Sequence, residues 1–500
     1  MGISWVTQKT PECPCPRAGA GKVGMEMNFA KYLSTGSIAA LMAAAPALAL
    51  AQNAPPENLL PMRDIPKTAP KRDGDEPQAA EQAKDVKEAF GDFAVQQGEV
   101  VQELPSLVGE WSVPQAEKLL AYIPSVKAEG LNPADYDTGL RAAIAAGEGP
   151  ALNETASRVF IWLVEDLRDG RTPMEARKQW FVVDPDPDRL PSHVLLEEAL
   201  ASGDIAGTLD RLMPVHSDYG RLKAQLATAK DAGKRKLIRA NMDRWRWLPQ
   251  DLGRQYLLTN VPEMQLRLTV GEKIIKSYRT VVGKPGRTAT PQLAEMVEAV
   301  IFNPTWTVPQ SIVKGEGLGN KVLGNPGWAR AAGYKATKGE NGWITVVQQP
   351  GPTNSLGLMK LDMPNEHAIF LHDTPSRNLF AQENRALSHG CIRVEGAREL
   401  AMTMSMLGNA SSRDEIPAIQ EEVSQITASG EYTRYPMEKQ WPVYITYFTM
   451  GTDVDGQMRS FTDVYDRDAP VLAALDAPRQ TDRARETSEE VVEIIDDMQT

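Results

Sequence analysis

One short segment of the sequence concentrates residues that could perform covalent chemistry. Residues 369–394 (IFLHDTPSRNLFAQENRALSHGCIRV) contain Cys391 and two of the five histidines of the chain, His372 and His389. A cysteine is a strong nucleophile only as its thiolate, and a neighbouring imidazole can take the thiol proton. His372 lies far enough upstream for the chain to loop back beside Cys391. The segment therefore favours a cysteine nucleophile with a histidine base.

The residues alone leave two other interpretations of Cys391 open. One is a buried structural thiol without chemistry. The other is a zinc site formed by Cys391, His372 and His389, since thiolate and imidazole are usual zinc ligands, although this spacing matches no common zinc motif. The nucleophile fits best because Gly390 would let a substrate carbonyl approach the backbone, where N–H groups could form an oxyanion hole.

The surrounding stretches resemble those of a known family. The strings His372-Asp373-Thr374-Pro375 and Ser388-His389-Gly390-Cys391-Ile392-Arg393-Val394 are similar to the active-site signature of the L,D-transpeptidases, which have a YkuD-type catalytic domain. The resemblance is to the large periplasmic class with a helical scaffold domain and a capping insertion. Supporting stretches are residues 282–285 (VGKP) with 290–291 (TP), 303–309 (NPTWTVP) and 356–360 (LGLMK).

The resemblance implies a cofactor-independent acyl transfer on peptidoglycan. Cys391 would attack the carbonyl that joins the third stem residue to the terminal D-alanine of a tetrapeptide. D-alanine would leave, and an amine of a second stem would resolve the thioester as a 3→3 cross-link. His372 would be the general base, oriented by the backbone carbonyl that follows it.

Further residues receive oxyanion or substrate roles from the same resemblance: Ser388, His389, Gly390, Arg393, Trp306 and Phe370. His389 and Gly390 would shape the oxyanion hole, and Arg393 would steady the loop or bind a stem carboxylate. On the residues alone, His389 could equally orient the loop only, and Arg393 could equally be a structural ion-pair partner. Asp373 is expected to hydrogen-bond locally.

The pattern of residues changes from helical to β-rich near residue 250 and predicts an α+β fold. Residues 86–250 are expected to form a helical scaffold domain, with a helix opened by Ser112 or Pro114, Asn132 as a cap and helical stretches at 156–167 and 222–248. Residues 251–450 are expected to form the β-rich catalytic domain. Its predicted elements are strands at 256–261, 264–270, 274–282 and 442–449 and a helix at 395–406.

Two segments of the second half stand apart from this pattern. Residues 311–350 are glycine-rich but carry Trp328, Tyr334 and Trp343, which solvated connectors rarely do, and this composition is typical of a lid or binding loop. The resemblance implies that this segment is the capping element over the cleft. Residues 451–500 are expected to be a C-terminal segment whose acidic tail, from Asp476, is solvated.

The N-terminus predicts export to the periplasm. A positive region at 28–31 (NFAK), an apolar run at 36–50 and the small residues of Ala49-Leu50-Ala51 predict a signal peptide cleaved after Ala51. A retained membrane anchor is the alternative, and the residues before Met25 do not resemble a signal. Residues 52–85 predict a flexible linker. Cleavage would leave Cys391 as the only thiol of the exported protein.

The net charge and the expected mechanism limit the possible partners. The net charge of −12 argues against a nucleic-acid binder. The expected partners are tetrapeptide stems as donor and acceptor, with other cell-wall enzymes as further candidates. If water resolved the thioester, the enzyme would be an L,D-carboxypeptidase, and if a protein amine did, it would anchor envelope proteins. A non-catalytic wall-binding scaffold is the alternative from a different class.

Overall fold

The computed structural model describes residues 107–479. The expected signal segment, the linker at 52–85, the start of the expected scaffold range and the tail from residue 480 lie outside these residues. The described part is α+β, as predicted, with helices first and a large sheet after them. Within it, no helix is both long and apolar enough to cross a membrane.

The first half of the described chain is helical. The predicted start at Ser112 is confirmed, because its side chain and that of Gln115 form a capping box. Asn132 caps only a short 3₁₀ turn, at Pro133–Asp135. The helices are α2 (Val113–Tyr122), α3 (Leu140–Ala146), α4 (Pro150–Arg168), α5 (Asp186–Arg189), α6 (Ser192–Ser202), α7 (Ile205–Asp210), α8 (Ser217–Thr228) and α9 (Ala232–Trp245).

The single helical stretch expected at 222–248 is wrong, because the chain breaks between α8 and α9. Ala229 takes an extended backbone after α8. Asp231 then starts α9 by accepting a hydrogen bond from the backbone N–H of Lys234. A capping aspartate inside an apparently continuous helical pattern is the signal that locates this break.

A ten-stranded sheet fills the second half of the described range, in the order β1-β5-β13-β2-β3-β4-β12-β10-β9, with β11 beside β4. Strand β9 also pairs with β5, so the path closes on itself. The strands are β1 (Trp180–Phe181), β2 (Gln255–Asn260), β3 (Gln265–Val270), β4 (Lys273–Gly283), β5 (Gln292–Phe302), β9 (Met359–Asp362), β10 (Leu371–His372), β11 (Ala386–Ser388), β12 (Ile392–Val394) and β13 (Thr433–Thr446).

The three strands predicted after residue 255 are confirmed, but the closing strand starts earlier than expected. Strand β13 begins at Thr433 rather than at residue 442. Its first part contains Pro436 and charged, exposed side chains, and the pairing with β5 shifts register between Pro436 and Trp441. An irregular, polar edge of this kind carries no clean period-two pattern.

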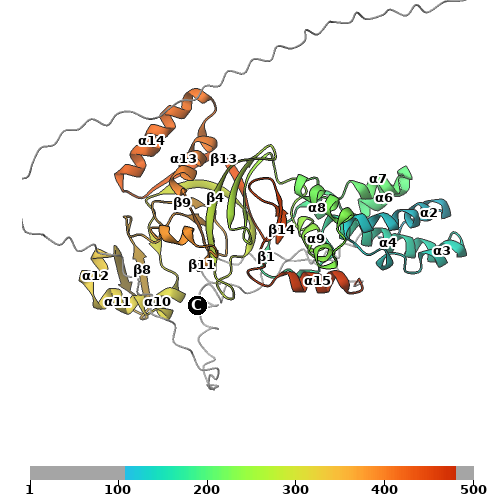
Figure 1. Cartoon of the computed structure of the whole chain (residues 1–500), viewed down its shortest axis with the longest axis horizontal. Helices are drawn as coiled ribbons and strands as arrows, with labels where there is room; N and C mark the ends of the chain where they lie inside the picture. The colour runs from blue at the N-terminus through green and yellow to red at the C-terminus, as the bar shows by residue number, and fades with distance from the viewer. Residues whose placement is uncertain (1–106, 480–500) are drawn as a thin grey trace, which may run out of the picture. The chain divides into compact units, whose positions relative to one another are not determined.

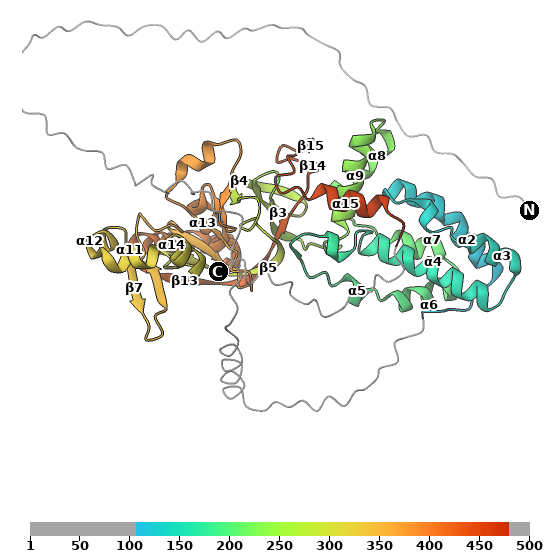
Figure 2. The same cartoon turned by 90° about the horizontal axis from the view of Figure 1, so that it is seen from below.

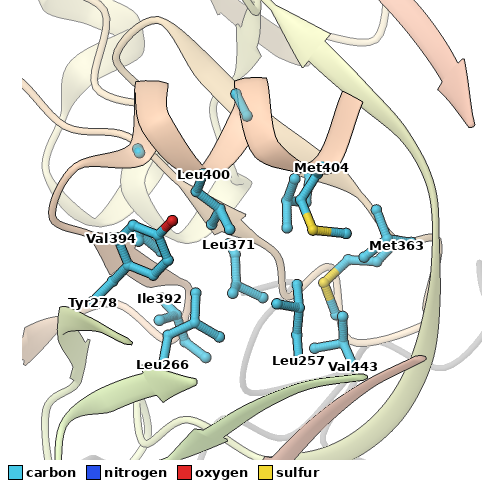
Figure 3. Packing of buried hydrophobic residues seen from close by; sticks show 14 of the residues in the cluster. Leu257, Leu266, Tyr278, Met363, Leu371, Ile392, Val394, Leu400, Met404 and Val443 are labelled. Carbon is cyan, nitrogen blue, oxygen red and sulfur yellow. The ribbon is translucent and has the colours of Figure 1, made fainter. Parts of the chain in front are cut away.

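The sheet encloses an apolar core that is covered by α13 (Ala397–Asn409), beside which lies α14 (Ile416–Ser429). Figure 3 shows Leu400 and Met404 of α13 pointing towards core residues that include Leu371 and Leu257. The helix expected at 395–406 starts two positions later because Gly396 has a φ of 69°, a left-handed conformation outside the helix.

The glycine-rich insertion folds as a lobe of its own, which we call the capping lobe and define as residues 306–348 (Figures 1 and 2). It contains β6 (Trp306–Thr307), α10 (Gln310–Gly315), α11 (Leu318–Gly324), α12 (Pro326–Ala331), β7 (Tyr334–Lys338) and β8 (Ile344–Gln348). Its strands form a separate three-stranded sheet, and its small core centres on Val308, Val313 and Val346. Of the aromatic residues that argued against a disordered connector, Trp328 and Tyr334 pack against this core, whereas Trp343 is exposed and lies beneath Lys314.

The end of the described chain returns to the helical region. After β14 (Met450–Thr452) and β15 (Met458–Ser460), helix α15 (Asp468–Asp476) packs against α9 (Figure 2). Asp476 pairs with Lys236 and Arg239, and the buried Arg479 pairs with Asp166. The expectation of a solvated chain from Asp476 is therefore wrong for residues 476–479.

An apolar core joins the two halves across residue 250. It combines Trp245 and Trp247 with Tyr256 of β2, Phe448 and Leu475 of α15. Trp245 lies between the rings of His216 and Phe448, at centroid distances of 4.2 Å and 4.5 Å. The change of pattern near residue 250 thus marks a change of secondary structure inside a shared core.

Asp243 is a buried anchor beneath this core. The side chain is fully buried and accepts hydrogen bonds from the backbone of the α4–β1 connection and from an indole. Although burial opposes it, Arg246 and these donors hold the pKa of Asp243 below its usual value. The partners are Arg171 N at 2.7 Å, Thr172 N at 3.1 Å, Trp247 Nε1 at 3.1 Å and Arg246 Nη1 at 3.5 Å.

We expect Asp243→Ala to lower the free energy of unfolding by about 3–5 kcal/mol, because it leaves several buried N–H donors without their acceptor and removes the carboxylate that pairs with the buried Arg246. Asp231→Ala is the matched control on the same helix. It removes only an exposed cap and should cost about 1 kcal/mol. Urea unfolding followed by tryptophan fluorescence measures both, and equal losses would contradict the assigned role of Asp243.

Candidate active site

Two short strands bring the histidine and the cysteine of the signature together. His372 ends β10, and Cys391 directly precedes β12, which pairs with β10 in parallel. In this register His372 lies opposite Arg393, and the N–H of Ile392 donates to the carbonyl of Phe370 at 3.1 Å. The sheet therefore performs the loop-back that the spacing of His372 and Cys391 predicts.

His372 is buried and fixed by its own neighbour. Its Nδ1 lies 2.5 Å from the carbonyl oxygen of Asp373, and because a carbonyl only accepts, Nδ1 carries the proton. The other nitrogen, Nε2, then has a free lone pair. Burial, followed by the charges of Arg393 and Lys360, lowers the pKa of His372 to about 3. The imidazole is thus neutral at neutral pH, as a proton acceptor must be.

Cys391 is half-buried, and its thiol faces a backbone carbonyl. Its Sγ donates to the carbonyl oxygen of Ala368 at 3.5 Å. Burial raises the pKa of Cys391 to about 11, against the opposing effects of a Phe370 backbone hydrogen bond, Lys360 and Arg393. No hydrogen bond joins Sγ to His372 within residues 107–479. The resting pair is therefore a neutral thiol beside a neutral imidazole, and the proton must move when substrate binds.

The loop before Cys391 is held by Ser388. Its side chain is buried, and its hydroxyl donates to the carbonyl of Cys391 at 2.6 Å and accepts from the N–H of Gly390 at 3.1 Å. Gly390 has a φ of 119°, which excludes other residue types without strain. Because the N–H of Gly390 is already used, Gly390 supplies the loop conformation rather than a free oxyanion donor.

A second layer of hydrogen bonds holds this loop, and it comes from the supporting stretches 282–285 and 290–291. Thr290 donates its hydroxyl to the carbonyl of Gly390 at 2.7 Å and accepts from the N–H of Gly283 at 2.8 Å. The hydroxyl of Tyr465 donates to the carbonyl of Gly283 at 2.7 Å. Tyr465 is a positioning residue that the sequence analysis missed, and nothing near it in the sequence indicates this contact.

Two cations flank the thiol. The Arg393 guanidinium has no carboxylate partner among residues 107–479, so the structure does not supply the ion pair considered as an alternative for it. Lys360 extends from β9 over the ring of Phe370, with its Nζ 4.5 Å from the ring centroid. The sequence analysis gave Lys360 no role of its own, although Lys360 is the last residue of the supporting stretch 356–360. Both charges favour an anion beside Cys391.

Asp373 bonds locally, as expected. Its Oδ2 accepts from the N–H of Leu358 at 2.9 Å, and its Oδ1 pairs with Arg377 at 2.6 Å. These contacts fix the residue whose carbonyl orients His372. Gly357 packs directly against this carboxylate with a φ of 62°, and a Cβ there would lie 2.3 Å from Oδ2 of Asp373.

For the acylation of Cys391 that the resemblance implies, we expect Gly357→Ala to lower the rate about 10- to 100-fold, because an added methyl group must displace Asp373 and with it the carbonyl that holds His372. Gly430→Ala is the control, since Gly430 also has a positive φ but nothing near its side-chain position. Single-turnover release of D-alanine measures the effect. Equal rates for the two variants would show that the Asp373 position is not needed.

The other expected site residues lie in different surroundings. Phe370 lies beside His372, with ring centroids 5.7 Å apart, whereas Trp306 packs against the core of the capping lobe. His389 is half-exposed and faces Glu316. His372, His389 and Cys391 do not converge, and residues 107–479 hold no group of three His, Cys, Asp or Glu side chains that could bind a metal.

Two cavities of the described chain lie away from this chemistry. One of about 170 Å³ is lined by residues such as Phe302 and Met402, and one of about 470 Å³ lies between α8, β3 and β14, around Arg221 and Arg267. Neither is lined by Cys391 or His372. These two cavities are therefore not part of the site formed by Cys391 and His372.

Comparison with known families agrees with this geometry. Residues 254–414 match the L,D-transpeptidase catalytic domain (YkuD), and residues 110–226 match the Scaffold domain. The chain carries an L,D-transpeptidase catalytic domain. The match contains β2 to β12 and both residues of the proposed pair, and the recognition made from the signature is confirmed.

The individual proteins that resemble this chain share little sequence identity with it. A Haemophilus influenzae protein named "Putative L,D-transpeptidase" is 27% identical over 265 residues, which cover 50% of this chain and 51% of that protein. The chain thus spans about half the length of this relative. A Mycobacterium smegmatis L,D-transpeptidase structure is 11% identical over 39% of this chain and 58% of its own, with a TM-score of 0.19. The structure of Mycobacterium tuberculosis L,D-transpeptidase 1 is 7% identical over 39% of this chain and 61% of its own, with a TM-score of 0.17. Structural similarities this weak carry no argument about this chain.

Proposed function

We propose that this protein is a periplasmic peptidoglycan L,D-transpeptidase that forms 3→3 cross-links through a thioester on Cys391. The observation that carries the proposal is the alignment of β10 and β12, which places a tautomer-fixed, neutral His372 beside the strand that Cys391 opens. The domain match supplies the class of reaction, and peptidoglycan stems are the proposed donor and acceptor.

Acylation starts from a neutral Cys391 thiol and a neutral His372 imidazole. His372 Nε2 takes the thiol proton while Sγ attacks the carbonyl before the terminal D-alanine. The tetrahedral intermediate collapses, the C–N bond breaks, and His372 returns the proton to the leaving amine. Lys360 and Arg393 favour the transient thiolate and the carboxylates of the donor. A neutral resting thiol also limits side reactions before substrate arrives.

The second half-reaction separates the candidate functions. Attack by a stem amine forms an amide and returns Cys391 to the thiol, whereas attack by water yields a tripeptide, as in an L,D-carboxypeptidase. A protein amine would instead anchor an envelope protein. The pairing of β10 with β12 and two cations without a carboxylate partner among residues 107–479 support a working site over a non-catalytic wall-binding scaffold, although burial raises the pKa of the resting thiol.

Mass spectrometry of products tests the proposal. The purified protein is incubated with disaccharide-tetrapeptide, and a cross-linked dimer one D-alanine lighter than two substrates is the expected result. Tripeptide without dimer would replace the proposal by the carboxypeptidase. Unchanged substrate, with no thioester on the protein, would favour the wall-binding scaffold.

A further inference from the structure

The capping lobe reaches the catalytic loop through one carboxylate. Glu316 directly follows α10, and its backbone N–H donates to the carbonyl of Ile312 at 3.1 Å. Its Oε1 lies 3.9 Å from Nε2 of His389, two residues before Cys391. Glu316 and His389 are the point at which the lobe and the Ser388–Cys391 loop face each other, and both side chains are 44% exposed.

No cation neutralises this carboxylate. Within residues 107–479, Glu316 has no lysine or arginine within ion-pair distance, and His389 is its single charged-pair candidate. Burial, followed by the charge of Lys284, lowers the pKa of His389, so its imidazole is neutral at neutral pH. The carboxylate is therefore an exposed negative charge beside the reactive loop.

Cations surround this point, because Lys284 and Arg393 act on His389, and Arg393 and Lys360 act on Cys391. Lys360 and Arg393 approach the thiol from β9 and β12, and neither has a carboxylate partner among the described residues. These cations attract the carboxylates of a donor stem and repel an ammonium group. An acceptor amine, which is protonated in water, is thus repelled by these cations and attracted to Glu316, the carboxylate that faces the loop.

We propose that Glu316 binds the ammonium group of the acceptor stem and presents it to the thioester on Cys391. The inference rests on the proposed transpeptidase function and names the residue that selects an amine over water. When the amine attacks, the C–N bond forms and the C–S bond breaks. The ammonium gives up two protons, of which one returns to the Cys391 thiolate and one passes to solvent. Water carries no positive charge, so hydrolysis gains nothing from Glu316.

The test measures how the thioester divides between amine and water. Glu316→Gln keeps the size of the side chain and removes its charge, and Glu316→Asp keeps the charge on a shorter stem. Glu340→Gln is the matched control, because Glu340 is an exposed carboxylate in the β7–β8 turn of the same lobe. Each variant is incubated with disaccharide-tetrapeptide, and dimer, tripeptide and protein-bound thioester are quantified by mass spectrometry.

We expect Glu316→Gln to lower the ratio of dimer to tripeptide about fivefold, which corresponds to an exposed charge pair, and to raise the fraction of protein held as thioester. Glu316→Asp should give an intermediate ratio, and Glu340→Gln should match the unchanged protein. A ratio in Glu316→Gln equal to that of Glu340→Gln would overturn the inference. So would loss of the thioester in Glu316→Gln, because Glu316 would then act on the donor. Absence of any thioester in the unchanged protein would instead refute the proposed function.

Discussion

Replacing Cys391 by alanine is expected to abolish the thioester and to lower dimer formation by at least about a thousandfold. Within residues 107–479, Cys391 is the only cysteine, and it directly precedes the strand that pairs with the strand of His372. A covalent adduct one D-alanine lighter than the substrate should appear on the unchanged protein and be absent from the variant. Electrospray mass spectrometry of the intact protein measures it.

The fold should survive this change. Cys391 is half-buried and packs at the edge of the apolar core, and its thiol makes one hydrogen bond, to the carbonyl of Ala368. Thermal unfolding of Cys391→Ala within about 2 °C of the unchanged protein would show that lost activity is lost chemistry. Cys391→Ser is the second variant, because it keeps a hydroxyl of similar size in the same place. Cross-linking retained in both variants would remove the cysteine mechanism.

His372→Gln should lower the rate of thioester formation about 10²- to 10⁴-fold, the usual contribution of a general base. The expected loss is large because burial raises the pKa of Cys391 to about 11, so almost no thiolate exists near neutral pH without a proton acceptor. In the variant the rate should rise with pH as hydroxide takes over the role of the base. Single-turnover D-alanine release between pH 6 and about 10 follows this change.

Two controls separate chemistry from structure in this variant. Alkylation of Cys391 at high pH should remain, since it needs only the thiol. The free energy of unfolding of His372→Gln should also fall less steeply with decreasing pH than that of the unchanged protein. The pKa of His372 is about 3 when folded and near its ordinary 6.5 when unfolded, so its stabilising effect is complete above pH 6.5 and is lost as pH falls towards 3. A neutral glutamine removes this dependence. Wild-type rates in His372→Gln would show that another group is the base.

The parts of the site that the sequence predicts are those whose signals are local. The Ser-His-Gly-Cys string and the upstream histidine are contiguous motifs, and the strands that carry them follow short β-branched runs. The pairing of β10 with β12 then needs only a loop between two neighbouring segments. The recognition of the family and the α+β fold rest on signals of the same kind, and both are confirmed.

The parts that the sequence does not predict depend on distant contacts or on backbone shape. Tyr465 reaches Gly283 from far along the chain, and no pattern links the two. Ala368 accepts a hydrogen bond from the thiol and has a φ of 51°, a backbone conformation that an alanine in the sequence does not indicate. Glu316 is one carboxylate in a glycine-rich insertion and gains meaning only when α10 places it opposite His389.

The core that joins both halves sets the order in which this chain can become complete. Helix α9 depends on α15 for part of its apolar cover, and Arg244 of α9 depends on Asp468 and on the carbonyl of Arg467. Both partners lie close to the end of the described chain. During synthesis the apolar face of α9 therefore stays partly uncovered until residues 467–475 have been made. A chain that stops before them contains the segment with His372 and Cys391 but lacks the partners of α9, whereas α2 to α7 already have a core of their own.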